Sequence, residues 1–346
     1  MRVLINGAGI AGLALAWWLE RDGHDVVLLE RAEPGRAAGY MVDCQGDGYD
    51  AVDRMGLLPR LRRHAFTLSA LVYHDPGGAV REVLPSDEVA TERLISLMRG
   101  DLEGALREDL RGGDLRFGVG VDRLDDEGDR LAAVLTDGGV ERADLLVGAD
   151  GFRSRVRGLL FGPARHCVRE LGFHAAAYSF TDAGLARSLD GAMHLVDAPG
   201  LQAGGYPVTG DDVSTLFIHR APPATPRPED PRRELRARYG HLGWLVPELL
   251  DRCPPPAAVH YDAVAQIELP AWHRGRAVLV GDACQAMSLL SGQGAGMALA
   301  GAAALADELR RDVPVGTALA RYERRLRPRV RELQAEARAT AEEFVP

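Results

Sequence analysis

The first thirty residues alternate between short apolar runs and glycine-rich turns. Residues 2–6 form an apolar run that predicts a buried strand, and residues 13–21 predict a helix that stops at Gly23. A second apolar run, residues 25–29, predicts another strand and ends on Glu30. A strand, a helix and a strand in this order are typical of the unit that opens a nucleotide-binding domain.

The stretch from residue 49 to residue 148 mixes helical and strand patterns. Residues 49–61 and 94–110 predict helices, the second with Asp101 as its cap. The predicted strands are residues 68–74, 80–84, 115–119, 131–135 and 143–148. An acidic turn at residues 122–129 separates two of these strands.

From residue 167 to residue 261 the pattern changes to short alternating stretches, which predict an antiparallel sheet. Its predicted strands are residues 175–180, 193–196, 205–208 and 213–219. Helices are predicted at residues 231–239 and 242–252. The nucleotide-binding pattern then returns, with a buried strand at 277–280, an apolar helix at 294–310 and a final amphipathic helix at 315–343 that Pro328 kinks.

These patterns predict an α/β fold in which a Rossmann-like nucleotide-binding lobe is interleaved with an antiparallel-sheet lobe and followed by a C-terminal helix. A chain of 346 residues is too long for one minimal core and suits two lobes. We assign residues 1–66, 92–165 and 274–346 to the nucleotide-binding lobe. Residues 67–91 and 166–273 form the sheet lobe.

Composition excludes several classes of function. The net charge of −9 gives no basic surface for nucleic acid. All 41 basic residues are arginine, and the absence of lysine excludes Schiff-base chemistry and a Walker-A phosphate site. The four cysteines are scattered without metal-binding spacing, so we expect no metal and a reduced, cytoplasmic protein. No apolar run reaches membrane-spanning length, so we expect no membrane association.

Residues 7–12 read Gly-Ala-Gly-Ile-Ala-Gly and match the G-x-G-x-x-G pattern. Gly7 allows the tight turn, Gly9 lets the backbone approach a pyrophosphate, and Gly12 lets the helix pack close to the strand. Glu30 is placed to accept hydrogen bonds from a ribose, and its charge argues against a 2′-phosphate. The pattern predicts a bound dinucleotide, but by itself it does not separate NAD from FAD.

Three further motifs stand where predicted strands end or predicted helices begin. Asp150-Gly151 follows the strand at 143–148, and Gly281-Asp282 follows the strand at 277–280. Gly292-Gln293-Gly294-Ala295-Gly296 opens the apolar helix, and Arg99 stands at the start of the helix that contains Asp101. Carboxylates at strand ends can accept hydrogen bonds from sugar hydroxyls, and glycine-rich helix starts can bind anionic groups through their backbone N–H groups.

In their order and rough spacing these motifs resemble those of the class A flavoprotein aromatic hydroxylases, the family of para-hydroxybenzoate hydroxylase and the tetracycline-modifying monooxygenases. The resemblance covers nearly the whole chain. It implies that the first lobe binds FAD and that the sheet lobe binds substrate. The residues that it implies for FAD are Gly7, Gly9, Ala11, Gly12, Glu30, Arg31, Arg99, Asp150, Asp282, Gly292, Gly294 and Ala295.

The resemblance also implies a reaction. NADPH or NADH, as a transient reductant, would reduce FAD, and O₂ would then form a flavin C(4a)-hydroperoxide that transfers one oxygen atom to an aromatic or polyketide-like substrate. Bacterial secondary metabolism or catabolism is the expected setting. The sequence leaves open whether the protein is a monomer or a homodimer.

Two departures from the family pattern keep other functions open. Gln285 stands where the family has His or Tyr, and Leu289 or Leu290 occupies the place of a proline expected against the flavin. One alternative is a flavin-dependent dehydrogenase or reductase that inserts no oxygen. Another is a non-catalytic FAD-binding protein.

Activation of a phenol often needs a base, and the sheet lobe carries His and Tyr residues that could supply one. The foremost candidates are Tyr206, His219 and His174. The other candidates are Tyr178, His194, His260 and Tyr261. Many enzymes of this family need no protein base, so the catalytic residues remain open.

Overall fold

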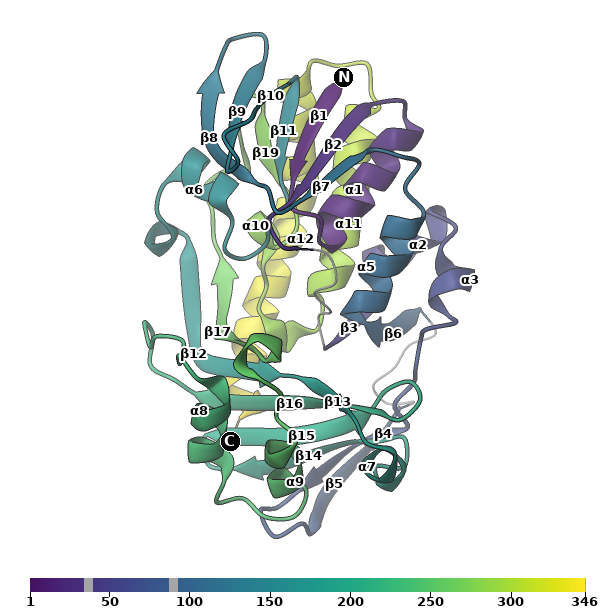
Figure 1. Ribbon diagram of the computed structural model, residues 1–346, viewed down its shortest axis with the longest axis vertical. Helices are drawn as coiled ribbons and strands as arrows, with labels where there is room; N and C mark the ends of the chain where they lie inside the picture. Colours follow the sequence, from purple (N-terminus) through teal and green to yellow (C-terminus); the bar gives the residue numbers. More distant parts are fainter. Residues whose placement is uncertain (34–39, 87–92, 346) are drawn as a thin grey trace.

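The computed structural model describes residues 1–33, 40–86 and 93–345, which form two lobes stacked along the long axis of the molecule (Figure 1). One lobe contains a six-stranded sheet and the other an eight-stranded sheet. Strands β12 (Val168–Ala177) and β17 (His260–Ile267) and helix α12 (Val315–Phe344) extend from one lobe toward the other. The predicted α/β fold with an antiparallel-sheet lobe is confirmed.

The six-stranded sheet has the order β18-β19-β11-β1-β2-β7. Its strands are β1 (Arg2–Asn6), β2 (Asp25–Glu30), β7 (Asp114–Phe117), β11 (Leu145–Gly148), β18 (His273–Arg274) and β19 (Ala277–Leu279). All neighbours pair in parallel except β18 and β19. The carboxyl ends of β1, β2, β11 and β19 therefore meet at one edge of the sheet.

The helices α1 (Ile10–Arg21) and α11 (Gly294–Leu309) beside this sheet are apolar because other elements enclose them on more than one side. Helix α1 is buried from Ile10 to Leu19, and it packs against α11. A helix enclosed in this way is apolar all round, as its sequence shows. Helix α12 packs against α11 in turn and contains Pro328 in its interior. The short helix α10 (Asp282–Gln285) precedes α11.

A small two-stranded sheet, β3 (Met41–Gln45) with β6 (Leu94–Met98), adjoins α11 and was not predicted. The predicted helix at 94–110 is wrong over its first five residues, which form β6, and the helix α5 is Arg99–Glu108. The predicted helix at 49–61 is also wrong as a single helix. It is α2 (Asp47–Arg54) and α3 (Leu58–Leu61), separated where Gly56 takes a φ of +71°.

A three-stranded antiparallel sheet stands apart at the upper left of Figure 1. It consists of β8 (Val121–Asp126), β9 (Leu131–Leu135) and β10 (Val140–Ala143). The acidic stretch 122–129 was predicted as a turn, but most of it belongs to β8, whose acidic side chains are exposed. Helix α6 (Arg155–Phe161) follows β11.

The eight-stranded sheet has the order β17-β12-β16-β15-β14-β4-β5, and β13 also pairs with β16. Its remaining strands are β4 (Ala70–His74), β5 (Val80–Pro85), β13 (Ser179–Thr181), β14 (Met193–Ala198), β15 (Leu201–Pro207) and β16 (Asp212–Arg220). Only β4 and β14 pair in parallel. Most predicted strands are present, and several extend further than their alternation indicated. The predicted strand at 175–180 is wrong as a single strand, since it covers the end of β12 and the start of β13, which are separated at Tyr178.

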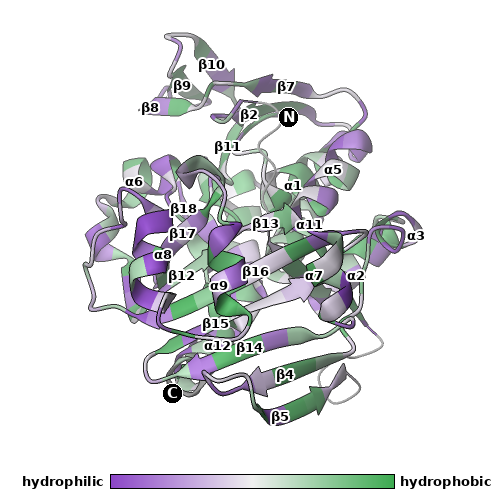
Figure 2. Cartoon of the chain, turned by 60° about the horizontal axis from the view of Figure 1, so that its bottom comes forward, coloured by the Kyte–Doolittle hydropathy of each residue, from purple (hydrophilic) through white to green (hydrophobic). Residues whose placement is uncertain are grey.

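The two faces of this sheet have different neighbours. Helices α7 (Ala183–Ser188), α8 (Pro231–Tyr239) and α9 (Val246–Asp251) cover one face, and α8 is strongly hydrophilic on its outer side (Figure 2). The predicted helix at 242–252 is limited to α9. The opposite face carries the apolar cluster of Met193, Leu195 and Tyr206, which packs against Met41 of β3 and therefore faces the other lobe.

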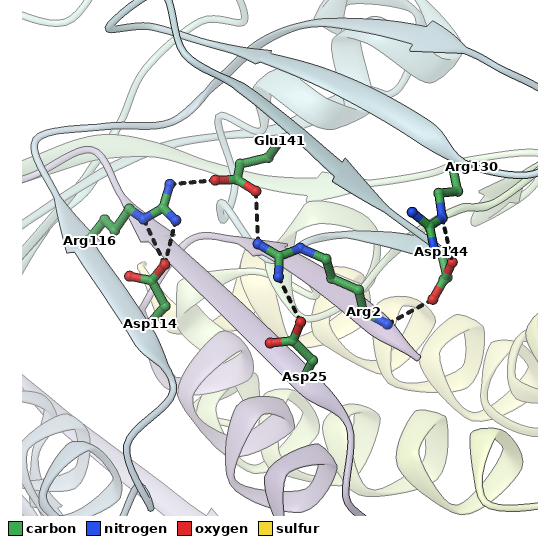
Figure 3. A network of polar contacts seen from close by, with 7 residues as sticks. All are labelled: Arg2, Asp25, Asp114, Arg116, Arg130, Glu141 and Asp144. Carbon is green, nitrogen blue, oxygen red and sulfur yellow. Dashed lines mark hydrogen bonds and ion pairs between the residues drawn. The ribbon is translucent and has the colours of Figure 1, made fainter.

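A network of ion pairs lies at the amino edge of the six-stranded sheet (Figure 3). Glu141 of β10 accepts hydrogen bonds from Arg2 of β1 at 3.0 Å and from Arg116 of β7 at 2.7 Å. The other members are Asp25, Asp114, Arg130 and Asp144. Glu141 is the only member that joins both of these arginines, so it connects three strands that are not consecutive in the chain.

We expect Glu141→Gln to lower the free energy of unfolding by about 1–2 kcal/mol, because two arginines lose a shared and mostly buried carboxylate. Urea denaturation at low salt measures this difference. The matched control is Glu127→Gln, which breaks the exposed pair with Arg142 and should leave the free energy of unfolding nearly unchanged. Equal losses in the two variants would contradict a special role for Glu141.

Candidate functional site

The loops that follow four parallel strands lie side by side at the carboxyl edge of the six-stranded sheet. The backbone N–H of Gly7, after β1, donates to Leu29 O of β2 at 2.7 Å. The N–H of Ala149, after β11, donates to Asn6 O at 2.8 Å, and that of Val280, after β19, donates to Gly148 O at 3.0 Å. This is the edge where open α/β sheets bind their ligands.

The first loop needs glycine at two positions for packing. A Cβ atom on Gly7, whose φ is +111°, would stand 2.4 Å from Ala149 O, and one on Gly12 would stand 1.8 Å from Gly7 O. Gly9 differs, since its nearest neighbour would be the Arg99 guanidinium at 3.5 Å. The Arg99 guanidinium thus lies at van der Waals distance from the Gly9 Cβ position at the N-terminus of α1, while Ala11 is buried against the Gly281 turn.

The Arg99 guanidinium is held in place at the start of α5. Its Nε donates to Glu103 Oε1 at 2.9 Å, and its Nη1 donates to the Tyr40 hydroxyl at 2.7 Å. Burial alone would lower the pKa of Arg99, but Tyr40 and Glu103 outweigh burial and raise it above its ordinary value. A fixed positive charge therefore faces the N-terminus of α1, where helix N–H groups also favour an anion.

The Glu30 carboxylate is oriented by two backbone groups at the end of β2. Its Oε2 accepts from Ala8 N–H at 2.9 Å, and its Oε1 accepts from Ala32 N–H at 2.8 Å. Each carboxylate oxygen keeps a further acceptor position. Arg31 follows it and is exposed.

Asp282 begins α10 after Gly281, which has a φ of +61°. Its side chain is exposed to solvent, and we use the word recess for the region that Asp282, Arg99 and the starts of α1 and α11 border. Desolvation by the surrounding protein raises the pKa of Asp282, and the Arg99 charge partly offsets the rise. A Cβ atom on Gly294 would stand 3.9 Å from Asp282 Oδ1, so this carboxylate borders the start of α11.

The N-terminus of α11 opens into the same region. Gly292 takes the left-handed conformation, with a φ of +64°, and Gly294 is the first residue of the helix. Ala295 is buried in the core. A Cβ atom on Gly48 of α2 would stand 2.3 Å from Gly296 Cα, so α11 and α2 approach each other closely. A 16-residue helix thus directs its first N–H groups toward the recess.

The Asp150 carboxylate stabilises the turn in which it lies by accepting hydrogen bonds. It accepts hydrogen bonds from Asn6 Nδ2 at 3.0 Å, from Arg155 N–H at 2.7 Å and from Val156 N–H at 3.1 Å. Asp150 thereby joins the end of β1 to the start of α6. A contact between Asp150 and FAD remains a prediction. The buried Arg157 donates to Ala283 O at 3.1 Å and so connects this turn to α10.

Gln285, the first departure from the family pattern, points into the core. Its Oε1 accepts from Gly281 N–H at 3.0 Å, and its Nε2 donates to the Tyr322 hydroxyl of α12 at 2.9 Å. Gln285 therefore fixes the Gly281 turn onto α12. At the second departure, Leu289 is exposed, while Leu290 packs against the cluster around Phe173.

Four of the seven candidate bases lie on the helix-covered face of the eight-stranded sheet. The His219 ring nitrogens Nδ1 and Nε2 lie 3.0 Å from the Tyr239 hydroxyl and 3.1 Å from the Tyr261 hydroxyl. The His174 ring packs against His219 with centroids 5.7 Å apart. The Tyr178 hydroxyl donates to Leu249 O of α9 at 2.7 Å. Catalytic roles for these residues stay untested predictions, but this face lies away from the recess.

The other three candidate bases are dispersed. His194 Nδ1 lies 2.9 Å from His74 Nε2 in a pair covered by Trp244. The half-buried His260 ring lies 5.1 Å from the Tyr40 ring. Tyr206 is the candidate on the face toward the other lobe, where its hydroxyl accepts from Met41 N–H at 3.2 Å. Of the seven, Tyr206 is thus the one placed in the apolar cluster.

Two site residues, Asp43 and Tyr40, were missed by sequence reasoning. Tyr40 directly precedes β3, and Asp43 lies within it. The sequence of this five-residue strand, Met-Val-Asp-Cys-Gln, does not alternate clearly between apolar and polar residues. Tyr40 orients Arg99, and Asp43 lies beside the Gly292 turn. No motif in the sequence marks either residue. In the described part of the chain no group of three or more His, Cys, Asp or Glu side chains is arranged to hold a metal ion.

Comparison with known proteins identifies the class. The FAD binding domain family matches residues 1–337, nearly the full chain. The chain therefore belongs to the class A FAD-dependent monooxygenase family, and it is a flavoprotein enzyme whose cofactor is FAD. Within the residues that the structure describes, no helix is both long enough and apolar enough to cross a membrane.

The relatives and neighbours agree with this membership. An uncharacterised protein of Mycobacterium tuberculosis, Rv1260, is 32% identical over 320 residues, which cover 89% of this chain and 84% of the relative. The FAD-dependent monooxygenase asL4 of Sarocladium schorii is 30% identical, covering 89% of this chain and 75% of the relative. The crystal structure of tetracycline destructase Tet(55) is 28% identical with a TM-score of 0.87, covering 99% and 89% of the two chains.

Proposed function

We propose that the protein uses NADH or NADPH and O₂ to insert one oxygen atom into an aromatic or polyketide-like small molecule. The single observation that carries this proposal is the position of the recess. It lies where Arg99, Asp282 and the N-termini of α1 and α11 converge, and β3 connects it to the apolar cluster around Tyr206. FAD, when bound, supplies the redox chemistry and the activation of O₂.

The residues of the recess fit FAD. The Arg99 guanidinium lies beside Gly9 at the N-terminus of α1, and a fixed positive charge next to helix N–H groups suits a pyrophosphate. Glu30 has acceptor positions left for ribose hydroxyls, and Asp282 is placed to accept from the ribityl chain. The first N–H groups of α11 would contact the pyrimidine end of the flavin and favour negative charge there.

A separate cavity of about 380 Å³ supports transient binding of the reductant beside the Asp150 turn. Its lining includes Arg153, Arg157 and Arg227, which offer positive charge to a pyrophosphate. Arg153 also pairs with Asp262 at 2.8 Å, and His174 lines the same cavity. We propose this cavity as the place where NADH or NADPH binds.

The apolar cluster supports an aromatic substrate. Met193, Leu195 and Tyr206 are buried there, and the Phe66 ring lies 6.4 Å from the Tyr206 ring in a stacked arrangement. Apolar and aromatic side chains with a few polar groups are typical of small-molecule sites. The tetracycline destructase neighbour also suggests a polycyclic substrate, and this we propose by analogy alone.

The test is a labelled-oxygen experiment on the purified yellow protein. NADH or NADPH is added without air to follow bleaching of the flavin, and ¹⁸O₂ is then admitted with a panel of phenols and polycyclic aromatics. Mass spectrometry should show one ¹⁸O atom in the product. Bleaching without labelled product would favour the dehydrogenase alternative, and bound FAD that neither nucleotide reduces would favour the non-catalytic one.

A further inference from the structure

One carboxylate, that of Asp43, lies between the Gly292 turn and the apolar cluster. Its Oδ1 accepts a hydrogen bond from the Ser96 hydroxyl at 2.6 Å, and Ser96 is the residue directly opposite it on β6. Its Oδ2 lies 3.6 Å from the position that a Cβ atom on Gly292 would occupy. One oxygen is therefore anchored in the small sheet, and the other faces the turn that opens α11.

The strand directs Asp43 toward the same side as Met41. Side chains at i and i+2 of a strand share a face, and Met41 packs in the apolar cluster while its N–H donates to the Tyr206 hydroxyl. A substrate that binds beside this cluster would therefore lie close to the Asp43 carboxylate. Tyr206 itself already accepts one hydrogen bond from the protein, so its hydroxyl is less available for this contact.

The surroundings of Asp43 favour proton exchange. Protein encloses the half-buried carboxylate and raises its pKa, an effect that the Ser96 hydrogen bond partly offsets. Its titratable neighbours are Tyr206 on β15 and Cys44 on β3, and burial, followed by the Asp43 charge, raises the pKa of Cys44 to about 12. Among the described residues no arginine or histidine forms an ion pair with Asp43.

We propose that Asp43 is the general base that accepts the proton of a phenol or enol hydroxyl on the substrate. The substrate O–H bond breaks, its electron pair stays on the substrate oxygen, and the proton bonds to Asp43 Oδ2 while Ser96 holds Oδ1. The substrate anion is more electron-rich and reacts faster with electrophilic oxygen. The proton returns to the product or to water. This role rests on the proposed monooxygenase function.

The test measures binding by the oxidised FAD holoenzyme, so it needs no turnover. The probes are 2-naphthol and 2-methoxynaphthalene, in which a methyl group replaces the hydroxyl hydrogen so that the oxygen can no longer donate a hydrogen bond. The change in flavin absorbance gives the Kd of each probe from pH 5 to pH 8.5. We expect a preference of about tenfold for 2-naphthol at pH 8, because a hydrogen bond to a charged acceptor is strong. The preference should disappear as Asp43 becomes protonated.

Two variants and a control separate the possible outcomes. Asp43→Asn should bind both probes equally at every pH, and Asp47→Asn, an exposed position on α2, should behave as the wild type. Ser96→Ala removes a hydrogen bond that stabilises the Asp43 anion, so the preference should be lost at a higher pH than in the wild type.

A wild-type preference in Asp43→Asn, an unchanged midpoint in Ser96→Ala, or no hydroxyl preference in the wild type would overturn the role of Asp43 alone. Failure of the wild-type protein to incorporate labelled oxygen into any substrate would overturn the proposed function and this role together. The binding experiment and the labelling experiment therefore give separate answers.

Discussion

Replacing Gly12 with alanine should yield colourless protein whose affinity for FAD is lower by about a hundredfold or more. The added Cβ atom would stand 1.8 Å from Gly7 O and 3.3 Å from the Ala149 side chain. Neither neighbour is the end of a flexible side chain, so α1 must move away from β1. That movement displaces the helix N-terminus from Arg99 and removes the pyrophosphate site. The ratio of absorbance at 450 nm to that at 280 nm after purification measures the loss.

The matched control is Gly104→Ala in the middle of α5. A Cβ atom on Gly104 has no neighbour within 4 Å, and alanine is the better helix former by about 1 kcal/mol. This variant should retain FAD and unfold at a slightly higher temperature. Circular dichroism of Gly12→Ala then shows whether the secondary structure persists without the cofactor. A Gly12→Ala protein that retains stoichiometric FAD would refute the packing argument.

The nucleotide-binding unit could be predicted from the sequence because its determinants are local. The apolar runs of β1 and β2, the glycines between them and the acid at the end of β2 all lie within thirty residues. The same holds for the strand before Asp282 and the glycines before α11. A Cβ atom on Gly7 would clash with Ala149, which explains why glycine is needed there. This clash involves the end of a strand that lies more than 130 residues away in the sequence, so the sequence pattern around Gly7 does not reveal it.

Short elements that are defined by distant partners could not be predicted. β3 and β6 lie about fifty residues apart in the chain and are stabilised by each other and by α11, so neither shows a clear pattern of its own. Asp43 was missed with them. The choice of Tyr206, His219 and His174 as candidate bases rests on residue type, because alternation cannot tell which face of a sheet helices will cover. α8 and α9 cover the face that carries His219 and His174, and the positions of these helices follow from tertiary packing.

Acid should destabilise the wild-type protein more steeply than a variant in which His219 is replaced by glutamine. Burial, together with the charge of Arg238 and the neighbouring His174, lowers the pKa of His219 to about 3. The unfolded chain binds this proton near pH 6.5, so folding requires a neutral ring at pH values where the unfolded chain is protonated. The stability from His219 is complete above about pH 6.5 and decreases as the pH falls toward 3.

The expected magnitude follows from linkage. Each pH unit below about 6.5 removes about 1.4 kcal/mol, so the wild type should lose about 3 kcal/mol more than His219→Gln between pH 7 and pH 4. At pH 8 the variant should be the less stable protein, by about 1–2 kcal/mol, because the hydroxyls of Tyr239 and Tyr261 lose well-placed partners. The two curves of unfolding free energy against pH should therefore converge or cross in mild acid.

Urea titrations at half-unit pH steps measure both curves, and His241→Gln is the matched control because His241 is exposed in the turn that follows α8. The control should remain parallel to the wild type, since carboxylates that titrate in acid are common to both proteins. If His219→Gln also remains parallel, the His219 ring is not kept neutral by its surroundings. A crossing would instead show that His219 stabilises this face as a neutral hydrogen-bonding partner, and that role depends on its not gaining a proton.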